Sequence, residues 1–99
     1  MTIQEEAVLR RSPRVVYRDL GAGRGAVLLR LDTGAYHGIN QTGVLIWGLL
    51  ESSPSLAELV PKLRAQLKSV PPGFEKEIDE FLSTLRDRDL IEVTEPTPG

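Results

Sequence analysis

The sequence predicts an α+β fold in which a three-stranded antiparallel sheet packs on a winged-helix-like bundle of three helices. Residues that favour β-strands gather in short runs between positions 15 and 39, and glycine-containing turns separate these runs. From position 41 to position 88, apolar residues recur at the intervals of amphipathic helices. The 99 residues suffice for one domain with one modest core.

Three strands are expected before the helices. Residues 15–18 are rich in β-forming side chains, residues 26–31 form the most apolar of these runs, and residues 35–39 follow directly after a turn. Residues 7–10 are a further candidate strand. The turn at 32–34 ends in a glycine, which adopts a positive φ readily, so the last two of the three strands form a hairpin.

The length of the hairpin turn leaves the register of its strands open. A three-residue turn at 32–34 would put His37 on the face of Leu29. A two-residue turn at 33–34 would put Tyr36 there instead. A shift of one residue reverses the face of every side chain in a strand. Tyr36 and His37 are therefore alternatives for the same position beside a ligand.

Three helices are expected to follow the sheet. Asn40 is a suitable N-cap for the first helix, at 41–51, whose apolar stripe is Gly43, Ile46, Trp47 and Leu50. Ser55 and Glu58 have the spacing of a capping box at the start of the second helix, which extends to position 67. Pro61 lies within this helix and is expected to kink or divide it, because proline lacks a backbone N–H group.

The third helix, at 74–88, shows the clearest apolar stripe in the chain. Its members are Phe74, Ile78, Phe81, Leu82 and Leu85. Most of this stripe is expected to lie in the core, and its margin is expected to form the floor of a groove beside the sheet. Residues 90–93 are a candidate terminal strand, and residues 94–99 are expected to be a disordered tail.

Composition argues against several classes of function. The chain has no cysteine and one histidine, His37, so disulfides, thiol nucleophiles and ordinary zinc sites are not available. Catalysis, a metal site and a bound cofactor are therefore not expected. The glycine-rich loop at 21–25 leads into a strand rather than a helix, which argues against phosphate binding. The first residues lack the pattern of a signal peptide, and the apolar run 44–50 is too short to span a membrane, so a cytoplasmic protein is expected.

Charge is distributed unevenly along a chain whose net charge is -2. Residues 10–30 contain six Arg and one Asp, whereas residues 74–95 contain eight acidic and three basic side chains. The third helix has five acidic and three basic residues, so its polar face would repel a DNA backbone. A winged-helix DNA-binding protein is therefore only an alternative, and neither nucleic acid nor a membrane is an expected partner.

The third predicted strand, at 35–39, is the last of its sheet and has one unpaired edge. An open strand edge beside an amphipathic helix is a means of holding an extended peptide by strand addition. The backbone would supply hydrogen bonds that do not depend on the peptide's sequence, and apolar pockets would supply selectivity. The sequence therefore predicts a peptide-binding protein.

The residues around this strand and the following helices resemble the PqqD-like proteins, the recognition elements of ribosomally made, post-translationally modified peptides. The resemblance covers about residues 13–93, between an N-terminal segment at 1–12 and the tail at 94–99. It depends on Leu29 through Asp32, Gly34, Tyr36, Ile39-Asn40, Thr42, Ile46-Trp47, Leu50, the helix at 55–67, Phe81-Leu82, Leu85 and Leu90-Ile91. The pair Thr42-Gly43 with Ile46-Trp47 is most similar to the free-standing type from lasso-peptide pathways. Ile39 stands where the family often has Leu, and Pro61 is a departure that affects the expected shape of the second helix.

The resemblance implies a non-catalytic protein that captures the leader segment of a precursor peptide and presents it to a leader peptidase and then to a lasso cyclase. The leader is expected to add as an antiparallel strand to residues 35–39, in a groove against the third helix, with Asp79, Arg86 and His37 at the rim. The full set of expected peptide-binding residues is Leu29, Leu31, Ala35, Tyr36, His37, Gly38, Ile39, Ile78, Asp79, Leu82, Leu85 and Arg86. A peptide carrier of a PQQ-type pathway, or of another pathway of modified peptides, is the alternative within this class.

Overall fold

The computed structural model of the chain describes residues 3–52, 54–67 and 69–95. In chain order its elements are β1 (Val8–Arg11), β2 (Val15–Asp19), β3 (Ala26–Arg30), β4 (Tyr36–Ile39), α1 (Gln41–Leu49), the short 3₁₀ helix η1 (Leu50–Ser52), α2 (Leu56–Gln66), α3 (Phe74–Asp87) and β5 (Ile91–Thr94). The predicted mixture of a three-stranded antiparallel sheet and three α-helices is confirmed. Of the tail expected to be disordered at 94–99, Thr94 is instead the last residue of β5, and residues 96–99 lie outside the described part.

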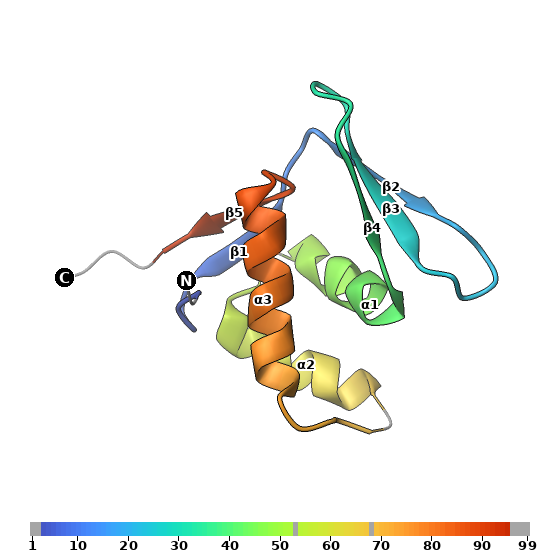
Figure 1. The fold of residues 1–99 in the computed structure, drawn as a ribbon. Helices are drawn as coiled ribbons and strands as arrows, with labels where there is room; N and C mark the ends of the chain where they lie inside the picture. Colours follow the sequence, from blue (N-terminus) through green and yellow to red (C-terminus); the bar gives the residue numbers. More distant parts are fainter. Residues whose placement is uncertain (1–2, 53, 68, 96–99) are drawn as a thin grey trace.

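The strands form two separate antiparallel sheets (Figure 1). The larger sheet has the order β2-β3-β4, so β4 lies at its edge. The smaller sheet joins β1 to β5, with Leu9 opposite Val93. The sequence indicated both short strands but not their pairing. In Figure 1 the two sheets lie on opposite sides of α3, and β4 is the strand of the larger sheet nearest to that helix.

The hairpin between β3 and β4 has a register that neither of the considered turn lengths describes. Leu29 lies opposite Tyr36 and Leu28 lies opposite His37, which leaves a four-residue loop at 31–34. Tyr36 therefore shares the face of Leu29, as the two-residue alternative predicts. His37 lies on the other face, which is turned toward the core.

Hydrogen bonds within the loop explain its length. The N–H group of Arg30 donates to the carbonyl oxygen of Ala35 (2.8 Å), and the N–H group of Gly34, with φ at 76°, donates to the carbonyl oxygen of Arg30 (2.8 Å). The guanidinium of Arg30 also donates to the carboxylate of Asp32 (2.7 Å). This bond, assisted by Arg14, lowers the pKa of Asp32 to about 2. The loop thus has its own network of bonds, which the turn residues alone did not indicate.

The helix starts follow the predicted caps. The side chain of Asn40 accepts a hydrogen bond from the N–H group of Gly43 (2.9 Å), and Ser55 and Glu58 form both bonds of a capping box. Pro61 lies inside α2, which is not divided there, contrary to one of the two predicted outcomes. One backbone bond is lost at a proline. The fully buried Leu59 and Leu63, on either side of it, keep this helix against the core.

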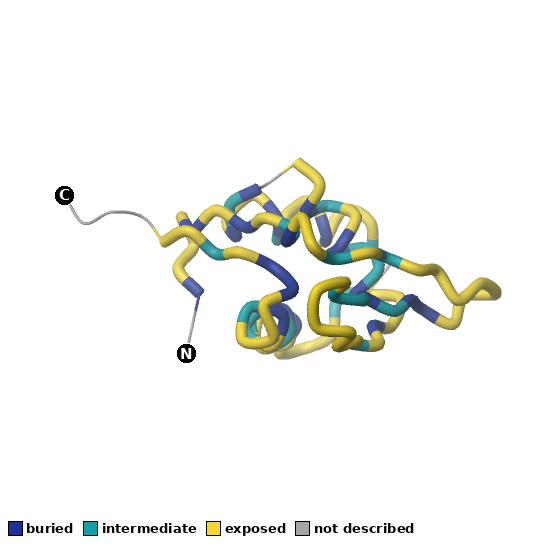
Figure 2. The backbone as a smooth tube through the Cα atoms, turned by 90° about the horizontal axis from the view of Figure 1, so that it is seen from above, coloured by how far each residue is buried: buried dark blue, intermediate teal, exposed yellow. Residues whose placement is uncertain are grey.

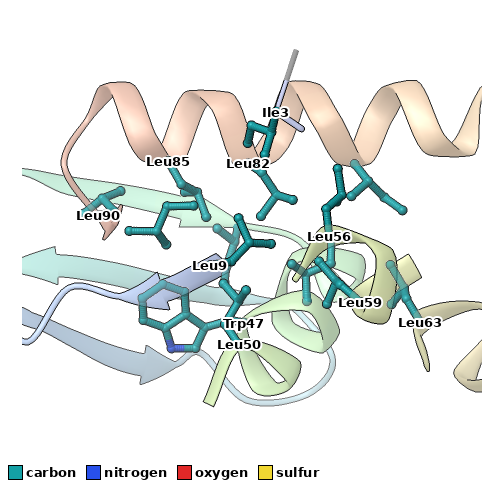
Figure 3. Close-up of a cluster of buried hydrophobic side chains, with 14 of the residues drawn as sticks. Ile3, Leu9, Trp47, Leu50, Leu56, Leu59, Leu63, Leu82, Leu85 and Leu90 are labelled. Atoms are coloured by element: carbon teal, nitrogen blue, oxygen red, sulfur yellow. The ribbon is translucent and has the colours of Figure 1, made fainter. Parts of the chain in front are cut away.

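One core joins both sheets to the helices. Figure 3 shows Leu82 and Leu85 pointing from α3 toward Leu9 of β1, with Trp47 and Leu50 beyond it. Buried residues lie mainly where the elements meet in the middle of the molecule, and the hairpin loops are largely exposed (Figure 2). No helix in the described ranges is long and apolar enough to cross a membrane.

Candidate functional site

β4 has one open edge. Among the described strands it pairs with β3 alone. The hydrogen bond from Arg30 to Ala35 marks the first bonded pair of this ladder. Because bonded and non-bonded pairs alternate in an antiparallel ladder, the N–H and C=O groups of Tyr36 and Gly38 point away from β3. These four backbone groups are available at the open edge for an added strand.

α3 has two margins that flank its buried stripe. At about 100° per residue, Glu77, Phe81 and Arg88 share one margin, whereas Asp79 lies on the other. The carboxylate of Asp79 accepts a hydrogen bond from the N–H group of Ile3 (2.9 Å), so its margin faces the N-terminal segment. The margin of Glu77, Phe81 and Arg88 faces the β4 side of the molecule, where two hollows lie.

The first hollow, of about 120 Å³, lies where α3 meets the junction between β4 and α1. It is lined by Asn40, Thr42, Gly43, Ile46, Phe74, Glu77, Ile78 and Phe81. Gly43 permits the close approach of these elements. A Cβ atom there would lie 2.9 Å from the Cβ of Ile39 and 3.1 Å from the Cζ of Phe81. The half-buried ring of Phe81 is therefore both part of the core and a wall of the hollow.

The second hollow, of about 280 Å³, lies between the start of β4 and the end of α3. Its lining residues are Ala35, Tyr36, His37, Asp87, Arg88, Asp89 and Leu90. His37 is half-buried, and its pKa is lowered because burial disfavours the charged form and because Arg88 repels it. The imidazole is therefore neutral at pH 7. We call these two hollows, which lie at the two ends of β4, together the β4–α3 groove.

The face of the larger sheet that is turned away from the core carries an exposed apolar row. Val16 lies opposite Leu29, and Leu29 lies opposite Tyr36. The exposed fractions of Val16 and Tyr36 are 43% and 72%. We call these three residues the outer row. The outer row reaches the open edge of β4 at Tyr36, which also lines the second hollow.

The fold has counterparts among known proteins. A family model described as coenzyme PQQ synthesis protein D (PqqD) matches residues 25–91, which is more than half of the chain. This chain belongs to the PqqD family. Comparison with curated proteins found no match.

Two solved structures are similar to this member of the PqqD family. One is described as TbiB1 in complex with the TbiA(beta) leader peptide. The two chains are 32% identical, and the similarity covers 84% of this chain and 94% of TbiB1 with a TM-score of 0.70. The other is described as lasso peptide synthetase B1 complexed with the leader peptide, with 23% identity, coverage of 85% and 96%, and a TM-score of 0.66. The second likeness concerns the fold alone.

The residues predicted for the site in this PqqD-family chain occupy several different environments. Ala35, Tyr36 and His37 line the second hollow, and Gly38 lies at the open edge. Leu29 belongs to the outer row, and Leu31 lies in the hairpin loop with 65% of its surface exposed. The strand residues thus divide between the open edge, the second hollow and the outer face.

The other predicted residues are mostly core residues. Ile39 is buried at the end of β4, whereas Ile78, Leu82 and Leu85 are buried because the stripe of α3 packs on β1 and on the first two helices. Of these, Ile78 also reaches the wall of the first hollow. Leu82 and Leu85 have no exposed surface, so a peptide does not reach them in this structure.

The two charged residues expected at the rim, Asp79 and Arg86, do not line either hollow. Both lie on the far margin of α3, seven residues apart in the sequence and therefore on one side of the helix. Asp79 bonds to Ile3, and Arg86 pairs with Asp87 (3.5 Å). The structure thus places both charges away from the two hollows, and an apolar stripe alone does not show which of its margins faces the sheet.

Among the lining residues that sequence reasoning missed are Glu77 and Phe81 on α3, Arg88 directly after it, and Asn40 and Thr42 at the start of α1. Helical spacing already places Glu77, Phe81 and Arg88 on one margin. A signal for them was thus present. No group of three or more His, Asp or Glu side chains in the described part of the chain is placed to hold a metal ion.

Proposed function

We propose that this chain binds the leader segment of a ribosomally made precursor peptide, in a lasso-peptide pathway, by adding the leader as an antiparallel strand to β4. The observation that carries the proposal is the open edge of β4 along the β4–α3 groove. The relative TbiB1, at 32% identity, was solved with a leader peptide bound, which supports the same ligand class here.

Backbone pairing alone is too weak to explain such binding. The four outward groups of Tyr36 and Gly38 offer at most four hydrogen bonds, each of which contributes about 0.5–1.5 kcal/mol. Ordering a flexible peptide costs about 1–2 kcal/mol per residue. Apolar burial must therefore supply the remaining free energy. The first hollow, with the volume of about four water molecules at ~30 Å³ each, accepts one aliphatic side chain of the leader.

The proposal extends to what happens after binding. We infer that the protein is itself non-catalytic and cytoplasmic, and that it presents the leader to a leader peptidase and to a lasso cyclase. The sole histidine, His37, lies in the second hollow, whose lining contains no Ser, Thr, Cys or Lys side chain. The winged-helix-like description of the fold is part of the same proposal.

A titration tests the proposed function. A fluorescent synthetic peptide with the leader sequence of the precursor encoded beside this gene is titrated with the protein and followed by anisotropy. We expect a dissociation constant in the micromolar range or below, and no saturation with a scrambled peptide of the same composition. Equal binding of both peptides, or no binding of the leader, would overturn the proposal.

The description of the matching family model favours one second candidate, a peptide carrier for coenzyme PQQ synthesis. The same titration separates the two, because a PQQ-type precursor peptide can replace the lasso leader as the probe. Tighter binding of the PQQ-type peptide would favour the second candidate.

A further inference from the structure

Each end of the β4–α3 groove has a charged side chain that forms no salt bridge in the described part of the chain. Glu77 lines the first hollow and Arg88 lines the second. Neither residue takes part in a salt bridge within the described ranges. By contrast, the acidic neighbours of Arg88 are paired: Asp87 with Arg86 (3.5 Å) and Asp89 with Arg30 (3.7 Å). Arg88 is the only guanidinium among the residues that line its hollow, where it lies beside the exposed carboxylates of Asp87 and Asp89.

The field of Arg88 reaches the strand side of the groove. Its positive charge contributes to the lowered pKa of His37, which lies on β4. Because His37 is neutral at pH 7, it does not compete with Arg88 for an anionic group of a ligand. A carboxylate entering this hollow would meet Arg88, whose guanidinium pairs well with a carboxylate.

The relative directions of β4 and α3 determine which end of a bound peptide meets which charge. The start of β4, at Tyr36, lies beside Arg88 at the end of α3, and the residue after β4, Asn40, lies beside Glu77 near the start of α3. β4 and α3 therefore run in opposite senses. A peptide that pairs antiparallel with β4 runs along α3, so its N-terminal part meets Glu77 first and its C-terminal part meets Arg88.

The distance between Glu77 and Arg88 along the helix also sets the spacing of the matching charges in the peptide. Arg88 lies eleven positions after Glu77, which at about 1.5 Å per residue corresponds to roughly 16 Å along the helix axis. An extended strand covers this length in about five residues. Side chains that face the same side of a strand are separated by an even number of positions. Charges four or six residues apart in the peptide therefore match the two ends.

We propose that Glu77 and Arg88 select leaders that carry a basic residue followed, four or six positions later, by an acidic residue. This inference rests on the proposed function and adds the charge order of the substrate. The two exposed charges contribute less affinity than the apolar contacts do. They fix the orientation and the register of the peptide, because like charges would meet if the peptide were reversed.

The test uses pairs of peptides that differ only in charge order. In the leader peptide that binds in the titration above, Lys is placed at one position and Glu four or six positions later, and the pair is moved through successive registers. The partner peptide has Glu first and Lys second. In the best register we expect the Lys-first peptide to bind about tenfold more tightly at low salt. This ratio should fall toward about twofold at 1 M salt, because ions screen exposed charges.

Charge reversal in the protein gives the decisive comparison. In the double variant Glu77→Lys/Arg88→Glu, the preference should invert in favour of the Glu-first peptide. The control is Lys76→Glu/Glu80→Lys, which exchanges charges on the same helix, outside both hollows, and also leaves the net charge unchanged. Circular dichroism verifies that both variants are folded. The control should keep the wild-type preference.

The outcomes separate this inference from the function on which it rests. Leader binding without any charge-order preference, in all registers, would overturn the inference and leave the proposed function standing. A wild-type preference for the Glu-first peptide would overturn the antiparallel direction on which the order depends. Absence of binding by every leader variant, including the unmodified one, would overturn the proposed function itself.

Discussion

At the scale of single residues, Gly43 is the position at which three elements meet. A methyl group there would approach Ile39 to 2.9 Å and Phe81 to 3.1 Å, so β4 or α3 would have to move. We expect Gly43→Ala to lower the free energy of unfolding by about 1–3 kcal/mol, as overpacking does, and to weaken leader binding because the first hollow changes shape. Urea denaturation and the leader titration measure the two effects.

A second glycine of the same helix serves as the control. Gly48 is exposed, and a Cβ atom there would meet nothing within 4 Å. Gly48→Ala should therefore raise the free energy of unfolding by up to about 1 kcal/mol, from helix propensity alone. If Gly43→Ala behaved like Gly48→Ala, close packing around Gly43 would not define the first hollow.

At the scale of elements, the two edges of β4 have different roles: one edge pairs with β3 in the folded sheet, and the other edge is open for a peptide. The N–H group of Gly38 points away from β3, so proline at this position removes a donor from the open edge without removing a bond of the sheet. We expect Gly38→Pro to weaken leader binding at least tenfold with little change in thermal stability. The control Gly38→Ala keeps the donor, has open space for its methyl group, and should bind within about threefold of wild type. Leader affinity unaffected by the proline would exclude strand addition at this edge.

The positions of the helices and strands were predictable from the sequence, whereas the register of the hairpin was not. The helix starts were predictable, because Asn40 and Ser55 are local signals that need no knowledge of the fold. The strand positions followed from runs of β-forming residues. The hairpin register did not follow from the sequence, because the loop at 31–34 contains bonds between Arg30 and Asp32 that turn propensities do not describe.

The site was predictable only in part, for a related physical reason. The open edge of β4 followed from the order of the elements. Helical periodicity identified the buried stripe of α3, but it treats the two margins of the stripe alike. Asp79 and Glu77 therefore looked equivalent in the sequence. Only the packing of the N-terminal segment on the margin of Asp79 leaves the margin of Glu77 for the groove.

At the scale of the whole molecule, α3 stands between a supporting side and a binding side. On the supporting side, β1 and β5 pair, and Ile3 is buried in the core with 1% of its surface exposed. On the binding side, β4 has an open edge and the groove lies beside it. Residues before position 25, which precede the family match, thus contribute to the same core as the matched part.

This division predicts that stability and binding can be changed independently. Ile3→Ala removes a buried side chain and should lower the free energy of unfolding by about 2–5 kcal/mol. Leader affinity, measured by calorimetry at a temperature where the variant is still folded, should stay within about twofold of wild type. The exposed neighbour Gln4→Ala should change neither quantity. A folded Ile3→Ala variant with clearly weaker leader binding would mean that the N-terminal segment also shapes the groove, because α3 would then transmit its packing from one margin to the other.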